Sequence, residues 1–290
     1  MGKDFYEEFP ETRAVFDSSY TDFDLKEMCF SGDEATLSRT RYTQPCMVAY
    51  AIAVTDLLRA NGIVPDYAAG LSLGEYSALY AAGVFDEKTA MELIDYRARI
   101  MDDASQGKDT AMAAVIGLSP EKTEQAVAQS QDMGIVDISN LNSKGQTVIG
   151  GEKKAVEKAS ALAKEMGAKR VVPLNVSGAF HTRLMNDASV LLKERMKTLT
   201  FSQMKLPVLF DVYGDVLPEN ADIKTALELQ IKSTVNFVGI IEKLREYGVE
   251  QVVEIGFGKV LCGFVKKTAP EIQTLSIETT DDFRGYINER

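Results

Sequence analysis

The sequence predicts an α/β protein in which a large parallel-sheet domain carries a small inserted domain. Its 290 residues exceed the roughly 150 residues of a typical domain, so two domains are expected. Over most of the chain, short apolar runs typical of strands alternate with helical patterns, which favours a parallel sheet. Between residues 107 and 177 this alternation gives way to a different order of elements. We therefore assign residues 1–106 and 178–290 to the large domain and residues 107–177 to the small one.

The first part of the large domain is expected to hold three helices and a short buried strand. Residues 42–61 predict a helix with Pro45 in its first turn, where a proline is tolerated. Residues 64–69 predict the strand, because an apolar run there ends at a glycine. The other two helices are expected over residues 74–82 and 87–105.

The inserted segment is expected to form strand, helix, two strands, helix and strand. Ser119 and Pro120 predict the start of its first helix, with the serine as cap and the proline in the first position. Gly167 predicts the end of the second, amphipathic helix. This order is that of ferredoxin-like modules. The strands are expected at residues 111–118, 135–142, 146–150 and 170–176, and the second helix at residues 153–166.

After the insertion the chain returns to alternating helices and strands. Helices are expected over residues 182–199 and 240–247, and strands over residues 205–212 and 249–255. A turn at residues 256–258 leads into a last predicted helix. This alternation completes the parallel sheet of the large domain.

Charge and composition exclude several classes of function. The net charge of −11 argues against nucleic-acid binding, which needs a cationic face. Cys29, Cys46 and Cys262 are far apart, and His181 is the single histidine, so a Cys/His zinc cluster is excluded and no metal is expected. The cysteines predict buried, reduced thiols. The chain has no apolar run long enough for a bilayer, so we expect a soluble cytoplasmic protein without a membrane partner.

Residues 70–74 match the pattern GxSxG between a predicted strand and a predicted helix. Small residues on both sides of Ser72 allow a sharp turn that exposes its hydroxyl, as in hydrolase-like α/β folds. The backbone N–H of Leu73 would then hold a developing oxyanion. The alternative is a serine that only caps a helix in a glycine-rich turn.

A serine nucleophile needs a base, and His181 is the one histidine available. It stands where a predicted strand meets a predicted helix, a position at which catalytic groups concentrate. If a histidine activates Ser72, that histidine must be His181. The alternative is a structural histidine.

Four segments resemble the malonyl-CoA:acyl carrier protein transacylase family, also called acyl carrier protein S-malonyltransferases. Residues 70–79 (GLSLGEYSAL) resemble its nucleophile segment, and residues 177–181 (SGAFH) resemble its histidine segment. Residues 95–101 (DYRARIM) resemble its arginine helix, and residues 254–261 (EIGFGKVL) resemble its C-terminal glycine turn. The four occur in the family's order along essentially the whole chain.

The resemblance implies an acyltransferase of fatty-acid biosynthesis that works in two half-reactions. Ser72 would take a malonyl group from malonyl-CoA, and the phosphopantetheine thiol of acyl carrier protein would then remove it. His181 would move the protons in both halves. No metal or redox cofactor is implied, and the partners are malonyl-CoA and acyl carrier protein.

The resemblance also assigns three further side chains. Arg97 would hold the free carboxylate of the malonyl group, because a planar guanidinium matches a carboxylate. Arg99 lies about 200° away on the same helix and is expected to face solvent. A carbonyl of Gln230 would orient His181, and Phe180 would favour malonyl over branched malonyl units; the alternative for Phe180 is a core aromatic.

The chain departs from the family in two places. Leu71 stands where the family usually has a histidine just before the nucleophile. The first residues resemble the helix that follows the family's first strand and GQGxQ loop, so this loop, which supplies a second oxyanion donor, is expected to be missing. We expect this loss to weaken catalysis, since one oxyanion donor contributes ~10²–10³ in rate.

Three alternatives to the fatty-acid enzyme remain open. The first is a discrete malonyl acyltransferase that serves a polyketide assembly line. The second is a GxSxG thioesterase or lipase, disfavoured because these enzymes place their histidine near the C-terminus. The third is a truncated, non-catalytic homologue that only binds acyl carrier protein. Docking an acidic carrier would need a local cationic patch, for which the candidates are Arg183, Lys259, Lys266 and Lys267.

Overall fold

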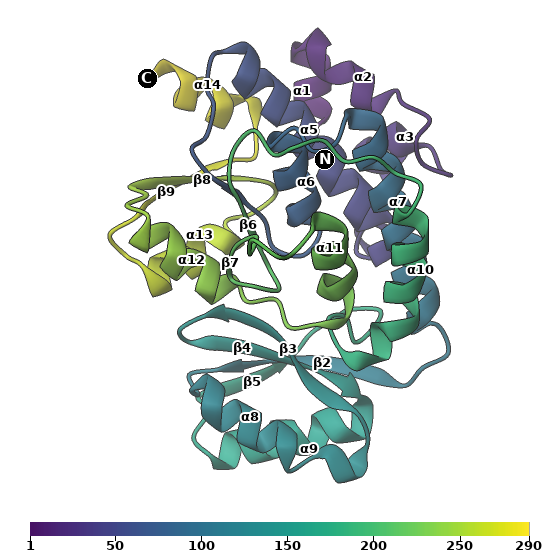
Figure 1. Ribbon diagram of the computed structural model, residues 1–290, viewed down its shortest axis with the longest axis vertical. Helices are drawn as coiled ribbons and strands as arrows, with labels where there is room; N and C mark the ends of the chain where they lie inside the picture. Colours follow the sequence, from purple (N-terminus) through teal and green to yellow (C-terminus); the bar gives the residue numbers. More distant parts are fainter. Residues whose placement is uncertain (290) are drawn as a thin grey trace. The chain divides into compact units, whose positions relative to one another are not determined.

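The computed structural model describes residues 1–289 and is an α/β protein (Figure 1). Contacts along the chain divide it into two compact units. Unit 1 comprises Met1–Ala98, Thr200–Leu209 and the chain from Arg245 onward, and unit 2 comprises Arg99–Leu199 and Phe210–Leu244. These units are not bounded like the domains predicted from sequence, and the boundary at residues 107–177 stays a prediction.

The N-terminal part of unit 1 is helical. Its longest helix, α5 (Thr40–Ala60), starts earlier than predicted, so Pro45 lies in the second turn and the expectation of a first-turn proline is wrong. The shorter helices are α1 (Lys3–Glu8), α2 (Arg13–Phe16), α3 (Leu25–Ser31) and α4 (Glu34–Leu37).

A hydrophobic core of unit 1 joins the two ends of the chain. The strands β8 (Gln251–Ile255) and β9 (Gln273–Ile277) pair in parallel. Side chains of α1, α5 and α14 (Thr280–Asn288) form one buried cluster with these strands, including Phe5, Tyr50 and Phe283.

The strand β9 and the helix α14 were not predicted, although the sequence carries a signal for the helix. Thr279 and Asp282 form a capping box at the start of α14, a pattern that marks helix N-termini.

The predicted strand over residues 64–69 is reduced to β1 (Ala68–Ala69). Pro65 and Asp66 lie inside the predicted run, and both residue types are poor strand formers. The partner strand β6 (Val208–Phe210) is also shorter than predicted and follows Pro207. The pairing is parallel, with Ala68 opposite Val208.

Two helices follow β1, and their ranges agree with the sequence prediction. The helix α6 (Gly74–Ala81) belongs to unit 1, and α7 (Glu87–Ser105) runs from unit 1 into unit 2. Near the C-terminus, α13 (Val260–Thr268) follows the glycine turn.

Unit 2 contains a four-stranded antiparallel sheet in the order β3-β4-β2-β5. The helices α8 (Pro120–Ala128) and α9 (Lys153–Glu165) cover one face of it (Figure 1). The predicted order of strand, helix, two strands, helix and strand is confirmed, and Ser119 caps α8 by accepting the N–H of Lys122. The strands are β2 (Thr110–Ile116), β3 (Val136–Ser143), β4 (Gln146–Glu152) and β5 (Arg170–Pro173).

One of the remaining helices of unit 2 carries Gln230, a residue of the candidate site. The predicted helix over residues 182–199 is divided into a 3-10 turn at Arg183–Met185 and α10 (Asn186–Met196). The helix α11 (Ile223–Lys232) packs against α10 and was not predicted, although Asp222 caps it by accepting the N–H of Thr225. The chain continues through α12 (Phe237–Glu246).

Two expectations about the whole chain can be compared with the described residues. Cys29, Cys46 and Cys262 are free thiols and buried, as predicted. Among residues 1–289, the structure contains no helix with the length and apolar character needed to cross a membrane.

Candidate active site

Ser72 lies in a sharp turn between β1 and α6, as the GxSxG pattern predicts. Its φ of 54° places it in the left-handed region, which costs energy for any residue other than glycine. The turn is so tight that a Cβ atom on Gly70 would lie 2.1 Å from the carbonyl carbon of Gly74. Glycine is therefore required at position 70 for this turn.

The backbone after Ser72 is arranged as the start of a helix. The N–H groups of Gly74, Glu75 and Tyr76 donate to the carbonyls of the residues three positions earlier, at 3.0–3.2 Å. Leu73 precedes them as the N-cap of α6, where a helix leaves N–H groups without intrahelical acceptors. This position suits the predicted oxyanion donor.

We expect Gly70→Ala to destabilise unit 1 and to slow any reaction of Ser72. The new methyl group would overlap the backbone of Gly74, and overpacking of this kind typically costs ~1–3 kcal/mol. Urea unfolding measures the loss. Gly74→Ala is the matched control, because a Cβ there meets no atom within 4 Å; equal losses in both variants would contradict the proposed geometry.

Arg97 projects from α7 to Ser72. Its Nη2 donates to Ser72 Oγ at 3.1 Å, and its side chain is fully buried, with 0% of the residue exposed. Arg99, two positions further along α7, is half-buried. The structure therefore brings together the two side chains that the sequence singled out as nucleophile and carboxylate ligand.

Gln44 of α5 is a contact of Arg97 that the sequence reasoning missed. Its Oε1 accepts from Arg97 Nη1 at 2.5 Å, and its Nε2 donates to Thr40 Oγ1 at 2.8 Å. Gln44 and Arg41 are the polar members of an otherwise apolar buried face of α5. That polar pair in an apolar helix was the available sequence signal.

His181 has the same unusual backbone conformation as Ser72. Its φ is 58°, and within residues 1–289 only Ser72 and His181 combine a side chain with a positive φ. Glycine at position 178 lets the backbone before His181 pass close to Ser105, because a Cβ on Gly178 would lie 1.9 Å from Ser105 Oγ. The His181 N–H donates to the carbonyl of Ile231 at 3.1 Å, which ties this loop to α11.

The ring of His181 is oriented by the backbone carbonyl of Gln230. The Nδ1···O distance is 2.7 Å, and His181 is only 4% exposed. A carbonyl oxygen can only accept, so Nδ1 carries the proton and Nε2 keeps its lone pair. His181 is thereby prepared to act as a base through Nε2, and the carbonyl expected from Gln230 is the backbone one.

Asp211 supports Gln230 and was not anticipated from the sequence. Gln230 Nε2 donates to Asp211 Oδ2 at 3.0 Å, and both residues are fully buried. The available signal was an acidic residue directly after the apolar run of β6. A buried carboxylate without such a role is rare, because burying it costs free energy.

We expect Asp211→Ala to lower the free energy of unfolding by ~1–3 kcal/mol, because it removes the acceptor of a buried hydrogen bond. Asp211→Asn keeps an acceptor oxygen in a side chain of the same shape and should cost less. Urea unfolding of the two variants measures the difference. Equal losses would mean that the contact with Gln230 contributes nothing.

Phe180 is half-buried and packs against a cluster on the sheet of unit 2. The cluster comprises Met112, Ala114 and Val148, and the carbonyl of Phe180 accepts from Ser139 Oγ at 3.0 Å. This packing fits the core-aromatic alternative. A role of Phe180 in selectivity stays a prediction.

The candidate residues form two groups, one in each unit. Ser72, Leu73 and Arg97 belong to unit 1, and His181 and Gln230 belong to unit 2. Within residues 1–289 no group of three or more His, Cys, Asp or Glu side chains could hold a metal ion.

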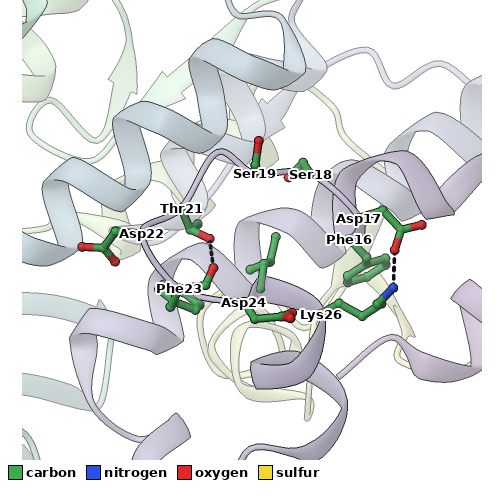
Figure 2. A pocket seen from close by; sticks show the side chains of 10 residues that line it. Phe16, Asp17, Ser18, Ser19, Thr21, Asp22, Phe23, Asp24 and Lys26 are labelled. Atoms are coloured by element: carbon green, nitrogen blue, oxygen red, sulfur yellow. Dashed lines mark hydrogen bonds and ion pairs between the residues drawn. The ribbon is translucent and has the colours of Figure 1, made fainter.

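A hollow of about 450 Å³ in unit 1 contains none of these residues (Figure 2). It lies on the segment between α2 and α3, and its carboxylates are engaged within the protein. Asp17 pairs with Lys26 at 2.5 Å, Asp22 pairs with Arg41, and Asp24 caps α3. We assign it no role in the chemistry.

Comparisons with known proteins identify the class of protein that this fold and site define. The family described as acyl transferase domain matches residues 1–280. The malonyl CoA-acyl carrier protein transacylase of Bacillus subtilis (strain 168) is 41% identical over 280 residues, which are 96% of this chain and 88% of that protein. The chain belongs to the malonyl CoA-acyl carrier protein transacylase family.

Solved structures agree with this assignment. The structure of MCAT from Streptococcus pneumoniae superposes with a TM-score of 0.94 at 37% identity, covering 100% of this chain and 95% of that one. A malonyl-transacylase in complex with a type II PKS acyl-carrier protein superposes with a TM-score of 0.95 at 34% identity, again over 100% and 95% of the two chains.

Proposed function

We propose that this chain transfers a malonyl group from malonyl-CoA to the phosphopantetheine thiol of acyl carrier protein, for fatty-acid biosynthesis. The names of its relatives support the reaction. The observation that carries the proposal is the hydrogen bond from the buried guanidinium of Arg97 to Ser72 Oγ at 3.1 Å. A cation beside the nucleophile suits an acyl group that bears a carboxylate.

In the first half-reaction, Ser72 Oγ attacks the thioester carbonyl of malonyl-CoA. His181 Nε2 takes the serine proton, and the N–H of Leu73 stabilises the oxyanion. The new C–O bond forms, the C–S bond breaks, and the proton passes from His181 to the departing CoA thiolate. Ser72 then carries the malonyl group as an oxygen ester.

In the second half-reaction, the carrier's thiol replaces CoA. His181 takes the thiol proton, sulfur attacks the ester carbonyl, and the C–O bond breaks. The proton returns to Ser72 Oγ. A thioester is exchanged for an ester and back without change of oxidation state, so the proposed reaction balances without a metal or redox cofactor.

Arg97 is proposed to select malonyl over acetyl. The carboxyl carbon of a malonyl group on Ser72 is three bonds from Oγ, and Arg97 Nη2 lies 3.1 Å from that oxygen. The carboxylate of the bound acyl group therefore lies within reach of the guanidinium. Phe180, near the base, is proposed to disfavour branched malonyl units.

The finer architecture and the location are also proposals. The sheet of unit 2 with α8 and α9 has the element order of a ferredoxin-like module. We propose that it is inserted in a hydrolase-like α/β domain that carries Ser72. Three free, buried thiols favour the reducing cytoplasm as the location.

The experiment that tests the function measures both half-reactions by mass spectrometry. Malonyl-CoA alone should add one malonyl group to the protein. When holo acyl carrier protein is added, the malonyl group should leave the protein and appear on the carrier. If the protein stays unmodified, the proposed enzymatic activity is refuted, and the chain is a non-catalytic homologue. Release of free malonate without carrier would indicate a hydrolase, and transfer restricted to a polyketide carrier would place it on an assembly line.

A further inference from the structure

We propose that Tyr76 is a positioning residue for substrate selection, and that its aromatic face holds the guanidinium of Arg97 in the orientation that receives the malonyl carboxylate. The inference rests on the proposed function, in which Arg97 binds that carboxylate. It goes beyond that function because Tyr76 touches no reacting atom and acts through Arg97.

The contact between the two side chains is a cation–π interaction in the protein interior. The central carbon of the Arg97 guanidinium lies 5.3 Å from the centroid of the Tyr76 ring. Both residues have 0% of their surface exposed. Such pairs attract within about 6 Å, and the attraction is stronger when both groups are removed from water.

Tyr76 contacts a guanidinium that also donates hydrogen bonds to other groups. Gln44 Oε1 and Ser72 Oγ accept from Nη1 and Nη2, and these hydrogen bonds act in the guanidinium plane. The Tyr76 ring adds a further contact to the guanidinium, and this contact limits the orientations that the guanidinium can take. Recognition of a carboxylate by two parallel hydrogen bonds depends on that orientation.

The aromatic face of Tyr76 is the group that we propose to hold Arg97. Burial raises the pKa of Tyr76, so the ring stays a neutral phenol at physiological pH. Phenylalanine keeps the aromatic face, so Tyr76→Phe should retain the selectivity for malonyl over acetyl.

The position of Tyr76 in the chain places its ring close to Ser72 along the sequence. It lies four residues after Ser72 and in the first turn of α6, so one short segment carries both the nucleophile and the aromatic face. A shift of the ring would move Arg97 relative to Ser72. A cation–π attraction depends on the negative charge of the ring's face. The selectivity for malonyl should therefore depend on the electron density of the Tyr76 ring.

A fluorination series at position 76 tests the proposal in the full-length protein. Tyr76→Phe is followed by 4-fluoro-, 3,5-difluoro- and 3,4,5-trifluorophenylalanine at the same position, which weaken the negative face with little change of shape. Transfer of malonyl and acetyl from their CoA esters to acyl carrier protein is measured as kcat/KM. We expect the malonyl value to fall stepwise by about tenfold over the series, and the acetyl value to stay constant.

Tyr80 provides a matched control on the same helix. Its ring lies 5.1 Å from the guanidinium carbon of Arg59, so it forms the same kind of pair away from Ser72. The same series at position 80 should leave the malonyl-to-acetyl ratio unchanged, and thermal unfolding should confirm that every variant is folded.

Two results would overturn the inference alone, given a parent protein that transfers malonyl. One is a malonyl kcat/KM that does not change with fluorination, and the other is an equal fall for malonyl and acetyl. A parent protein that does not transfer malonyl at all would overturn the proposed function as well, so the two failures are distinguishable.

Discussion

Ser72→Ala is expected to abolish the covalent malonyl adduct that malonyl-CoA leaves on the parent protein. The side chain sits in a strained turn at the start of α6, and without its hydroxyl no ester can form. Intact-mass spectrometry measures the adduct, and peptide mapping locates it. Labelling that persists in Ser72→Ala would mean that another residue is the nucleophile.

Two further variants make this result specific. Ser77→Ala alters a serine inside α6 and should keep the adduct. His181→Ala should slow acylation by ~10²–10⁴, the usual contribution of a general base. Since His181 is the single histidine, no other imidazole can replace it, and rapid acylation of His181→Ala would refute its role.

Arg97→Ala is expected to lower kcat/KM for malonyl-CoA by at least ~10–100-fold. A hydrogen bond to a charged group contributes ~1.5–3 kcal/mol, and a factor of ten corresponds to about 1.4 kcal/mol. Acetyl-CoA has no carboxylate, so its transfer should be unchanged or improved. The measurement is transfer of each acyl group to acyl carrier protein under the same conditions.

Two further variants in α7 show whether the lost activity reflects carboxylate binding by Arg97. Arg97→Lys should recover only part of the malonyl activity, because an ammonium cannot reproduce the two parallel hydrogen bonds. Arg99→Ala should change little. If Arg97→Ala lowers malonyl and acetyl transfer equally, the role of Arg97 is structural. If Arg99→Ala lowers only malonyl transfer, Arg99 is the residue that binds the carboxylate.

Local patterns were the part of this protein that the sequence could predict. The GxSxG segment predicted a strand, a tight turn and a helix, because only glycine permits the approach seen at Gly70. The helix α7 was predicted over its full range, since its apolar spacing has no glycine or proline to interrupt it. Arg97 was chosen over Arg99 from the resemblance, and it is the one that contacts Ser72.

The predicted element bounds were wrong where an apolar run contained a proline, and two helices were missed. Apolar runs around Pro65 and Pro207 suggested long strands, yet proline cannot donate to a sheet, and β1 and β6 are short. The helix α11 and the helix α14 were missed because their caps, Asp222 and Thr279, were not recognised.

The sequence by itself determined the chemistry: one serine in a turn that requires glycine, one histidine, and an arginine on a helix. Only the tertiary structure decided what surrounds them. Three supporting residues, Gln44, Tyr76 and Asp211, lie far along the chain from the side chains they contact or come from a different element. The local signals at Gln44 and Asp211 do not show which side chain each of them contacts. Hydrogen bonds and ring contacts in a protein interior depend on distances of a few ångströms in space, which spacing along the chain does not specify.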